Sequence, residues 1–196
     1  MRNPELTKET ILEKSGRLFN THGYKATSIS HITDATGFTK GAVYRHFKSK
    51  EELEQASLFY LSSIMFDKIR RVIKRETTAG KKLRAVFSYF ESYISAPPVE
   101  GGCPLLNAAI EADDAHPLLR GEAIKVLNIL RDSLITILEN GIKHDQIRAG
   151  IDKKYYATII IASLEGAIMM SKLRGDSADI KRVITHLERS IGEIEL

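Results

Sequence analysis

Apolar residues recur three and four positions apart along most of the chain, and this spacing constrains the fold more than any other feature of the sequence. It matches the 3.6-residue repeat of an α-helix, whereas a strand would alternate apolar and polar residues. The pattern is clearest in the stretches that begin at Ile11, Leu83, Ile124 and Ile180. The sequence therefore predicts an all-α protein of about nine helices without a convincing strand.

Several residues mark where helices start and stop. Gly23 follows the first periodic stretch as a stop signal. Ser49 and Glu52 have the spacing of a capping box at the head of a long helix, about 50–76. Pro97-Pro98 is expected to end a later helix, because proline disfavours helical backbone in the residue before it.

The second half of the chain is divided in the same way. Pro104 and Pro117 each suit the first position of a helix. Two final helices are expected over about 153–174 and 177–194. The apolar run 155–170 is shorter than a bilayer requires and contains a glutamate, so we interpret it as a buried helix of a soluble protein.

Cysteine content and the start of the chain bear on the compartment. Met1 to Glu5 does not lead into an apolar stretch, so a secretory signal is not expected. Cys103 is the single cysteine, which excludes an internal disulfide and fits a reducing cytoplasm.

Positive charge is concentrated at one end. Residues 1–50 hold nine Lys and Arg against four acidic residues, a net charge of +5, whereas the remainder holds 20 against 21. A small basic head on a nearly neutral body points to a polyanionic partner for the head alone. A merely solvated run of charges is the alternative.

The segment 27–47 has the pattern of two short helices joined by a tight turn at Gly37. Thr27 and Thr39 are expected to cap the two helices. Apolar residues are expected to pack the pair against the first helix, so that the second helix presents its polar side outward. These are the requirements of a helix-turn-helix that reads DNA. The residues assigned to its core are Phe19, Ile29, Ile32, Val43 and Phe47.

The runs GYKATSISHI (23–32) and TGFTKGAVYRHFKSKEEL (36–53) resemble the N-terminal signature of the tetracycline-repressor (TetR) family of bacterial regulators. The resemblance covers residues 7–55 in detail, and beyond them only chain length and helix number. It implies a helix-turn-helix domain over 1–48 and a ligand-binding and dimerisation domain over 49–196. The implied function is that of a ligand-responsive regulator, a repressor that binds a near-palindromic operator as a homodimer.

The resemblance also implies individual roles. Thr27 and Lys50 should contact phosphate, and His46 should contact the DNA backbone. The start of the second helix of the helix-turn-helix should lie in the major groove. Arg45 occupies a position that is often aromatic in the family, so contact with a guanine and contact with a phosphate both stay open. As an alternative, Tyr44 packs beneath the second helix and does not contact DNA. The alternative for Thr27 and Thr39 is that they only cap their helices. The full DNA-binding set is Thr27, Ser28, Thr39, Lys40, Gly41, Tyr44, Arg45, His46 and Lys50.

By analogy with the family, large or adaptable side chains in the body line a pocket for a small-molecule effector, with plain core packing as the alternative. They are Met65, Phe66, Phe87, Phe90, Tyr93, Asn107 and Met169. The helix over 153–174 is apolar nearly all round, so one side can face its own core and another a second copy of the chain. In a two-fold dimer, the last two helices of each subunit would form a four-helix bundle. The expected dimer contacts are Ser163, Gly166, Ala167, Met170, Val183 and Leu187.

Other constellations are weaker. Glu111, Asp113, Asp114 and His116 have metal-binding side chains, but their place at a helix end favours capping, so neither a metal nor a cofactor is expected. Cys103 suits a buried or capping position better than a redox sensor. An enzyme would need a catalytic group set, and none is recognisable. A helical protein-interaction module would leave the basic head unexplained.

Overall fold

The computed structural model describes residues 3–112 and 116–196. These residues form nine α-helices, and an isolated bridge between Ile147 and Glu195 is their one β-type pairing. The prediction of an all-α fold is confirmed. The helices are α1 (Pro4–His22), α2 (Ile29–Thr36), α3 (Lys40–His46), α4 (Lys50–Ile73), α5 (Ala79–Glu91), α6 (Pro104–Ala112), α7 (Pro117–Lys143), α8 (Lys153–Arg174) and α9 (Ala178–Gly192).

The helices belong to two compact units. Unit 1 comprises Met1–Met65 with Val99–Val126, and unit 2 comprises Phe66–Pro98 with Leu127–Leu196. Unit 1 thus contains α1–α3 together with α6, and the long helices α4 and α7 contribute residues to both units. The boundary expected at residues 48 and 49 falls inside unit 1.

Four of the five residues that the sequence predicts for the core of the helix-turn-helix are buried, and the fifth, Ile29, is half-buried. Phe19, Ile32 and Phe47 are all buried, and Val43 joins them from α3. The ring of Tyr24 stacks on that of Phe19 with centroids 5.0 Å apart. Burial of these side chains holds α2 and α3 on α1, which leaves the remaining sides of the two short helices exposed.

The cap of α2 differs from the prediction by one residue. Ser28, not Thr27, is the N-cap, and its hydroxyl accepts from the backbone N–H of His31 at 3.2 Å. Thr27 is 1% exposed, and its hydroxyl donates to the carbonyl of Gly23 at 2.7 Å. The expectation that Thr27 caps α2 is therefore wrong, because the preceding turn already uses its hydroxyl.

Some of the other helix boundaries lie where the sequence predicts them, and two do not. Thr39 caps α3 as predicted, by accepting from the Ala42 N–H at 3.2 Å. Pro104 and Pro117 begin α6 and α7, and α8 has the predicted bounds. Two helices end earlier than expected. α4 stops at Ile73, and α5 stops at Glu91, ahead of the two prolines.

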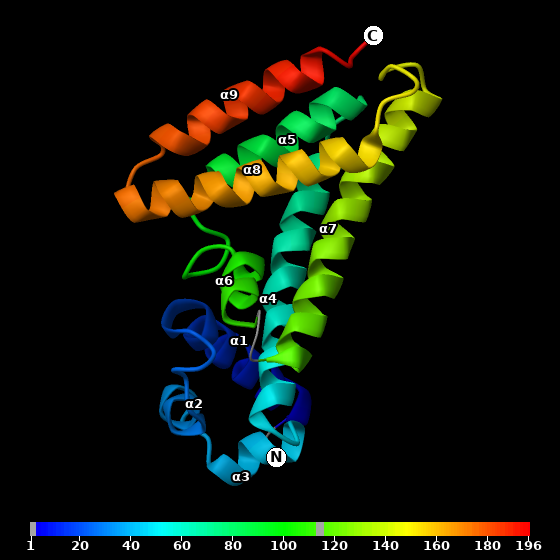
Figure 1. Ribbon diagram of the computed structural model, residues 1–196. Helices are drawn as coiled ribbons and strands as arrows, with labels where there is room; N and C mark the ends of the chain where they lie inside the picture. The colour runs from blue at the N-terminus through cyan, green and yellow to red at the C-terminus, as the bar shows by residue number, and fades with distance from the viewer. Residues whose placement is uncertain (1–2, 113–115) are drawn as a thin grey trace. The chain divides into compact units, whose positions relative to one another are not determined.

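Unit 2 is built around α8, which packs beside α9 and α5 (Figure 1). Among the described helices, α8 alone is long and apolar enough to cross a bilayer by length and composition. Its inner side contributes buried residues such as Ile160, Leu164 and Ile168 to the core. A core helix passes the same test of length and composition, and the packing of α8 on two neighbours fits that role.

The end of the chain closes unit 2 against α5. Glu195 accepts two hydrogen bonds from the guanidinium of Arg84, at 2.8 and 2.6 Å. At the start of α5, the backbone N–H of Ala79 donates to Oε1 of Gln146 at 2.8 Å. The hydrogen bonds from Arg84 lower the pKa of the Glu195 carboxyl below its ordinary value of 4.5.

This pair makes stability depend on pH. A carboxyl whose pKa is lowered by folding stabilises the folded state above its ordinary pKa, and that contribution is lost as pH falls through the lowered value. We expect Glu195→Gln to lower the free energy of unfolding at pH 7 by about 0.5–1.5 kcal/mol, a modest cost because solvent screens the half-exposed pair. Below pH 4.5 the difference from wild type should shrink. Urea unfolding at several pH values measures it, and Glu193→Gln, at an exposed position, is the control.

Candidate nucleic-acid interface

The outer side of α3 is exposed and polar. Lys40, Gly41, Tyr44 and Arg45 are exposed there, and Thr39 is exposed at the cap. The Tyr44 side chain is 39% exposed, and the ammonium of Lys40 lies 5.8 Å from the centre of its ring. Tyr44 therefore does not fill the space beneath the helix, and its ring is accessible to a ligand.

Gly41 has no structural requirement within the chain. A Cβ atom built at this position would have no neighbour within 4 Å, and the backbone is not in the left-handed region. Glycine in a helix is less stable than alanine by about 0.5–1 kcal/mol. A glycine that costs stability and solves no internal packing problem is consistent with close approach of another molecule to this side of α3.

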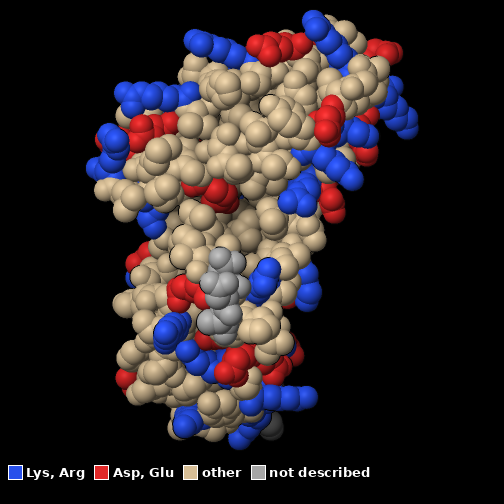
Figure 2. All heavy atoms as spheres, in the orientation of Figure 1, with Lys and Arg blue, Asp and Glu red and all other residues tan. Residues whose placement is uncertain are grey.

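The residues that flank α3 have different accessibility. Ser28 is exposed, but its hydroxyl caps α2, and His46 is half-buried at the end of α3. Lys25 and Lys48 are exposed basic residues near them. Figure 2 shows Lys and Arg side chains at the lower edge of its view, over the end of unit 1 that contains α2 and α3.

Lys50, at the start of α4, is engaged inside unit 1. Its Nζ donates to the carbonyl of Tyr24 at 2.7 Å and lies 3.1 Å from a carboxylate oxygen of Glu54. Glu54 is 2% exposed, and its other oxygen lies 2.6 Å from Nε2 of His116. An isolated charge in the interior is costly, so Glu54 needs these partners. The expected role of Lys50 as a phosphate partner stays a prediction.

The turn between α1 and α2 is held from α6. The carboxylate of Glu111 accepts from the backbone N–H groups of Tyr24 and Lys25, both at 3.0 Å. Gly23 makes room for this carboxylate, since its φ is 93° and an added Cβ would lie 2.8 Å from a Glu111 oxygen. Burial, with smaller effects from Glu111 and Glu54, raises the pKa of the Tyr24 hydroxyl. Glu111 thus fixes the backbone immediately before α2.

A second contact joins the same helices. The amide of Asn107 donates to both the carbonyl and the side-chain oxygen of Asn20, at 3.1 and 3.0 Å, and also to the Gly101 carbonyl. Asn20 in turn donates to the carbonyls of Glu100 and Gly102. The sequence predicts no contact role for Asn20, and it predicts that Asn107 lines the effector pocket. In the structure the Asn107 amide joins α6 to the end of α1.

The importance of the Glu111 contact is open to direct measurement. We expect Glu111→Gln to lower the free energy of unfolding by about 1–2 kcal/mol, because an amide supplies one acceptor oxygen for two backbone donors. The control is Glu100→Gln, which removes the exposed ion pair between Glu100 and Arg17. Such exposed pairs contribute less than about 1 kcal/mol. Equal urea midpoints for the two variants would contradict the assigned role of Glu111.

Two family models match the chain. The model described as "Bacterial regulatory proteins, tetR family" matches residues 11–56. The model described as "Tetracyclin repressor-like, C-terminal domain" matches residues 79–187, more than half of the chain. The chain belongs to the TetR family. It is accordingly a transcriptional regulator with a helix-turn-helix, and not an enzyme.

Solved structures agree with this membership. A TetR transcriptional regulator from Chloroflexus aurantiacus is 35% identical, with a TM-score of 0.95 and complete coverage of both chains. A TetR-family regulator from Cytophaga hutchinsonii is 32% identical, with a TM-score of 0.92, and the match covers 100% of this chain and 98% of that one.

A curated relative agrees at lower identity. The repressor KstR2 from Rhodococcus jostii is 27% identical over 72% of this chain and 68% of its own length. Another curated relative, YerO from Bacillus subtilis, is 39% identical but matches over only 27% of its own length.

The residues expected to line an effector pocket in this TetR-family regulator are distributed over both units. Met65 and Asn107 belong to unit 1 and the other five to unit 2. Phe87, Phe90 and Tyr93 are buried, whereas Met169 is 43% exposed. Unit 2 has an apolar cavity of about 10 Å³, and Phe90 is the only expected residue that lines it. The residues around it are Val86, Phe90, Leu130, Leu134, Ile160, Ile161, Leu164 and Glu165.

The expected dimer contacts also divide by accessibility. Ala167 and Leu187 are 0% and 2% exposed within the subunit, whereas Met170 is exposed. Ser163, Gly166 and Val183 are half-buried, and a Cβ added at Gly166 would meet nothing within 4 Å. Exposed or half-buried small and apolar residues recur along one side of α8 at helical spacing. This α8 stripe consists of Tyr155, Ile159, Ala162, Gly166, Met169, Met170 and Leu173.

The candidate metal-binding group and the single cysteine lie mainly within the described residues. Asp113 and Asp114 lie outside the described residues, and the described ranges contain no group of three metal-binding side chains. Glu111 and His116 both hold hydrogen bonds within unit 1. Cys103 is buried just before α6. A buried position is one of the two that the sequence favours for this residue over redox sensing.

Proposed function

We propose that the protein is a cytoplasmic, homodimeric repressor that binds a near-palindromic DNA operator through α3 and is released by a small-molecule effector. The observation that carries the proposal is the exposed side of α3, where Lys40, Gly41, Tyr44 and Arg45 project from a buried platform. In a helix-turn-helix, side chains near the start of the second helix reach base edges in the major groove.

The contacts follow from accessibility. The Tyr44 ring and the Arg45 guanidinium are assigned to base edges, and Lys40 and Thr39 to the groove beside them. Ser28, His46 and Lys25 are assigned to the phosphate backbone. Thr27 is left out because its side chain is 1% exposed and its hydroxyl is already bonded. The ammonium group of Lys50 has three N–H donors. One bonds the carbonyl of Tyr24 and one faces Glu54, so Lys50 contacts phosphate through the third.

The proposed dimer contact is the α8 stripe, which includes Met170, together with Val183 of α9. A row of apolar side chains with a small residue at its centre suits a second copy of the same helix, because two-fold symmetry brings identical surfaces together. Ala167 and Leu187 are excluded from this contact, since they pack inside the subunit. Two copies of α3 would then read two half-sites about one helical turn of DNA apart.

The proposed effector site is the apolar cavity among α5, α7 and α8. A cavity of about 10 Å³ holds no more than a water molecule, so an effector must open it. Of the helices around the cavity, α7 also contributes residues to unit 1, and its movement is the proposed link between effector binding and DNA release. An effector that favours the opened state by about 1–3 kcal/mol would weaken DNA binding by the corresponding factor, and DNA would weaken effector binding equally.

DNA binding tests the core of the proposal. Duplexes selected from a random pool on the purified protein define the operator, and titration at several salt concentrations gives the affinity. We expect affinity to fall steeply with salt, because phosphate contacts release counterions. Tyr44→Ala should weaken operator binding by about 1–3 kcal/mol but leave non-specific binding nearly unchanged. Tyr44→Phe separates the hydroxyl from the ring, and failure of the folded protein to bind any duplex at low salt would overturn the proposal.

A further inference from the structure

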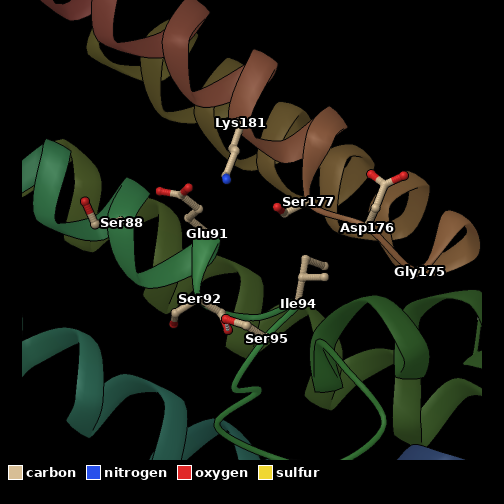
Figure 3. Close-up of a pocket in the computed structure, with 9 residues that line it drawn as sticks. All are labelled: Ser88, Glu91, Ser92, Ile94, Ser95, Gly175, Asp176, Ser177 and Lys181. Atoms are coloured by element: carbon tan, nitrogen blue, oxygen red, sulfur yellow. Dashed lines mark hydrogen bonds between the residues drawn. The ribbon is translucent and has the colours of Figure 1, made fainter.

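A polar cleft in unit 2 is separate from the apolar cavity. It has a volume of about 640 Å³ and shares no lining residue with that cavity. One side is formed by the end of α5 and the residues after it, and the other by the turn between α8 and α9 and the first turn of α9 (Figure 3). Pockets for small molecules commonly have volumes of about 300–1,000 Å³, so the cleft can hold one.

Two opposite charges face each other across the cleft without pairing. Glu91 extends from α5 and Lys181 from α9, and their charged ends point toward one another (Figure 3). Among the residues that the structure describes, neither side chain has an ion pair or a hydrogen bond. In the same unit, Arg174 and Arg182 both form an ion pair with Asp179.

Beside the two charges, the cleft presents a hydroxyl and an apolar group (Figure 3). Ser177 occupies the N-cap position of α9, yet its side chain makes no capping hydrogen bond. Asp176 accepts from the Ala178 N–H in its place, at 2.8 Å, which leaves the Ser177 hydroxyl directed into the cleft. Ile94 is half-buried and forms part of the opposite wall (Figure 3).

We propose that this cleft binds a small zwitterion, an α-amino acid. Its ammonium group pairs with Glu91, its carboxylate pairs with Lys181 and accepts a hydrogen bond from Ser177, and its side chain lies against Ile94. A ligand with only one charge would meet a like charge on one side of the cleft, whereas a zwitterion complements both sides. Charge-assisted hydrogen bonds are the stronger kind, so loss of either charged group of the ligand should abolish most of the binding.

Thermal unfolding without DNA tests the site. The probes are a mixture of the twenty common L-α-amino acids at millimolar concentration, the same mixture N-acetylated, and the corresponding amides. A ligand that binds only the folded protein raises its Tm. We expect the free amino acids to raise Tm and the two blocked mixtures to leave it unchanged. No shift with the free amino acids, or equal shifts with all three mixtures, would overturn the proposal.

Variants then locate the binding. The component that raises Tm is titrated by calorimetry against the wild type, Lys181→Met, Glu91→Gln and the control Lys74→Met, whose exposed lysine is outside the cleft. We expect a loss of affinity of at least about tenfold for both cleft variants, the usual effect of removing a hydrogen bond to a charged group, and none for the control. Unchanged affinity in either cleft variant refutes the site. Because DNA is absent, either outcome leaves operator binding to be judged separately.

Discussion

Replacing Gly166 with arginine is expected to convert the protein into monomers and to reduce its affinity for a two-half-site operator by at least about a hundredfold, the loss that follows when two linked binding sites are separated. Gly166 lies at the middle of the α8 stripe, and nothing in its own subunit lies within 4 Å of an added Cβ. The change should therefore leave the folded subunit intact and block only the approach of a second copy.

The matched control is Gly121→Arg. Gly121 lies on an exposed part of α7, and an added Cβ there would also have no neighbour within 4 Å. Light scattering at micromolar concentration gives the oligomeric state, and circular dichroism verifies the fold. If the Gly166 variant stays dimeric, or if the wild type is monomeric, then α8 is not the dimer contact. Affinity for a single half-site should be the same in all three proteins.

Gly41→Leu is expected to change stability and DNA binding in opposite directions. Leucine has a better helix propensity than glycine, so the free energy of unfolding should rise by about 0.5–1 kcal/mol. The same side chain would occupy the space where α3 approaches the base edges. Loss of several groove contacts, each worth about 1–3 kcal/mol, predicts at least a hundredfold weaker operator binding.

Gly121→Leu again serves as the control, because it makes the same change on an exposed helix outside α3. It should raise stability similarly and leave DNA affinity unaltered. Urea unfolding and DNA titration on the same preparations separate the two effects. If the Gly41 variant binds the operator as tightly as wild type, then this side of α3 does not face the groove.

The sequence predicted best those features that depend on chemistry within one helical turn. The cap at Thr39 and the prolines that begin α6 and α7 act on backbone groups only a few residues away, so their neighbours in sequence determine the outcome. Thr27 and Ser28 are both good caps, and residue type alone does not choose between them. The choice depends on the hydroxyl of Thr27, which bonds within the preceding turn.

Features that depend on distant partners were not predictable in the same way. Asn107 and Glu111 are four residues apart and so share one side of α6, but their partners near residues 20–25 lie more than eighty positions away. A helix that is apolar nearly all round likewise does not reveal which side faces its own core. The sequence therefore predicts Ala167 for the dimer contact, although the structure buries it inside the subunit.

The hydrogen bonds from Glu111 and Asn107 have a consequence for exchanging parts between regulators. A chimera that transfers only residues 1–48 would place a foreign turn opposite Glu111 and a foreign side chain opposite Asn107. The transferable cassette therefore has to include 99–112, although fifty intervening residues separate the two pieces. For the same reason, substitutions that accumulate near residues 20–25 during evolution should be accompanied by changes near 101–111, and the two segments should diverge together.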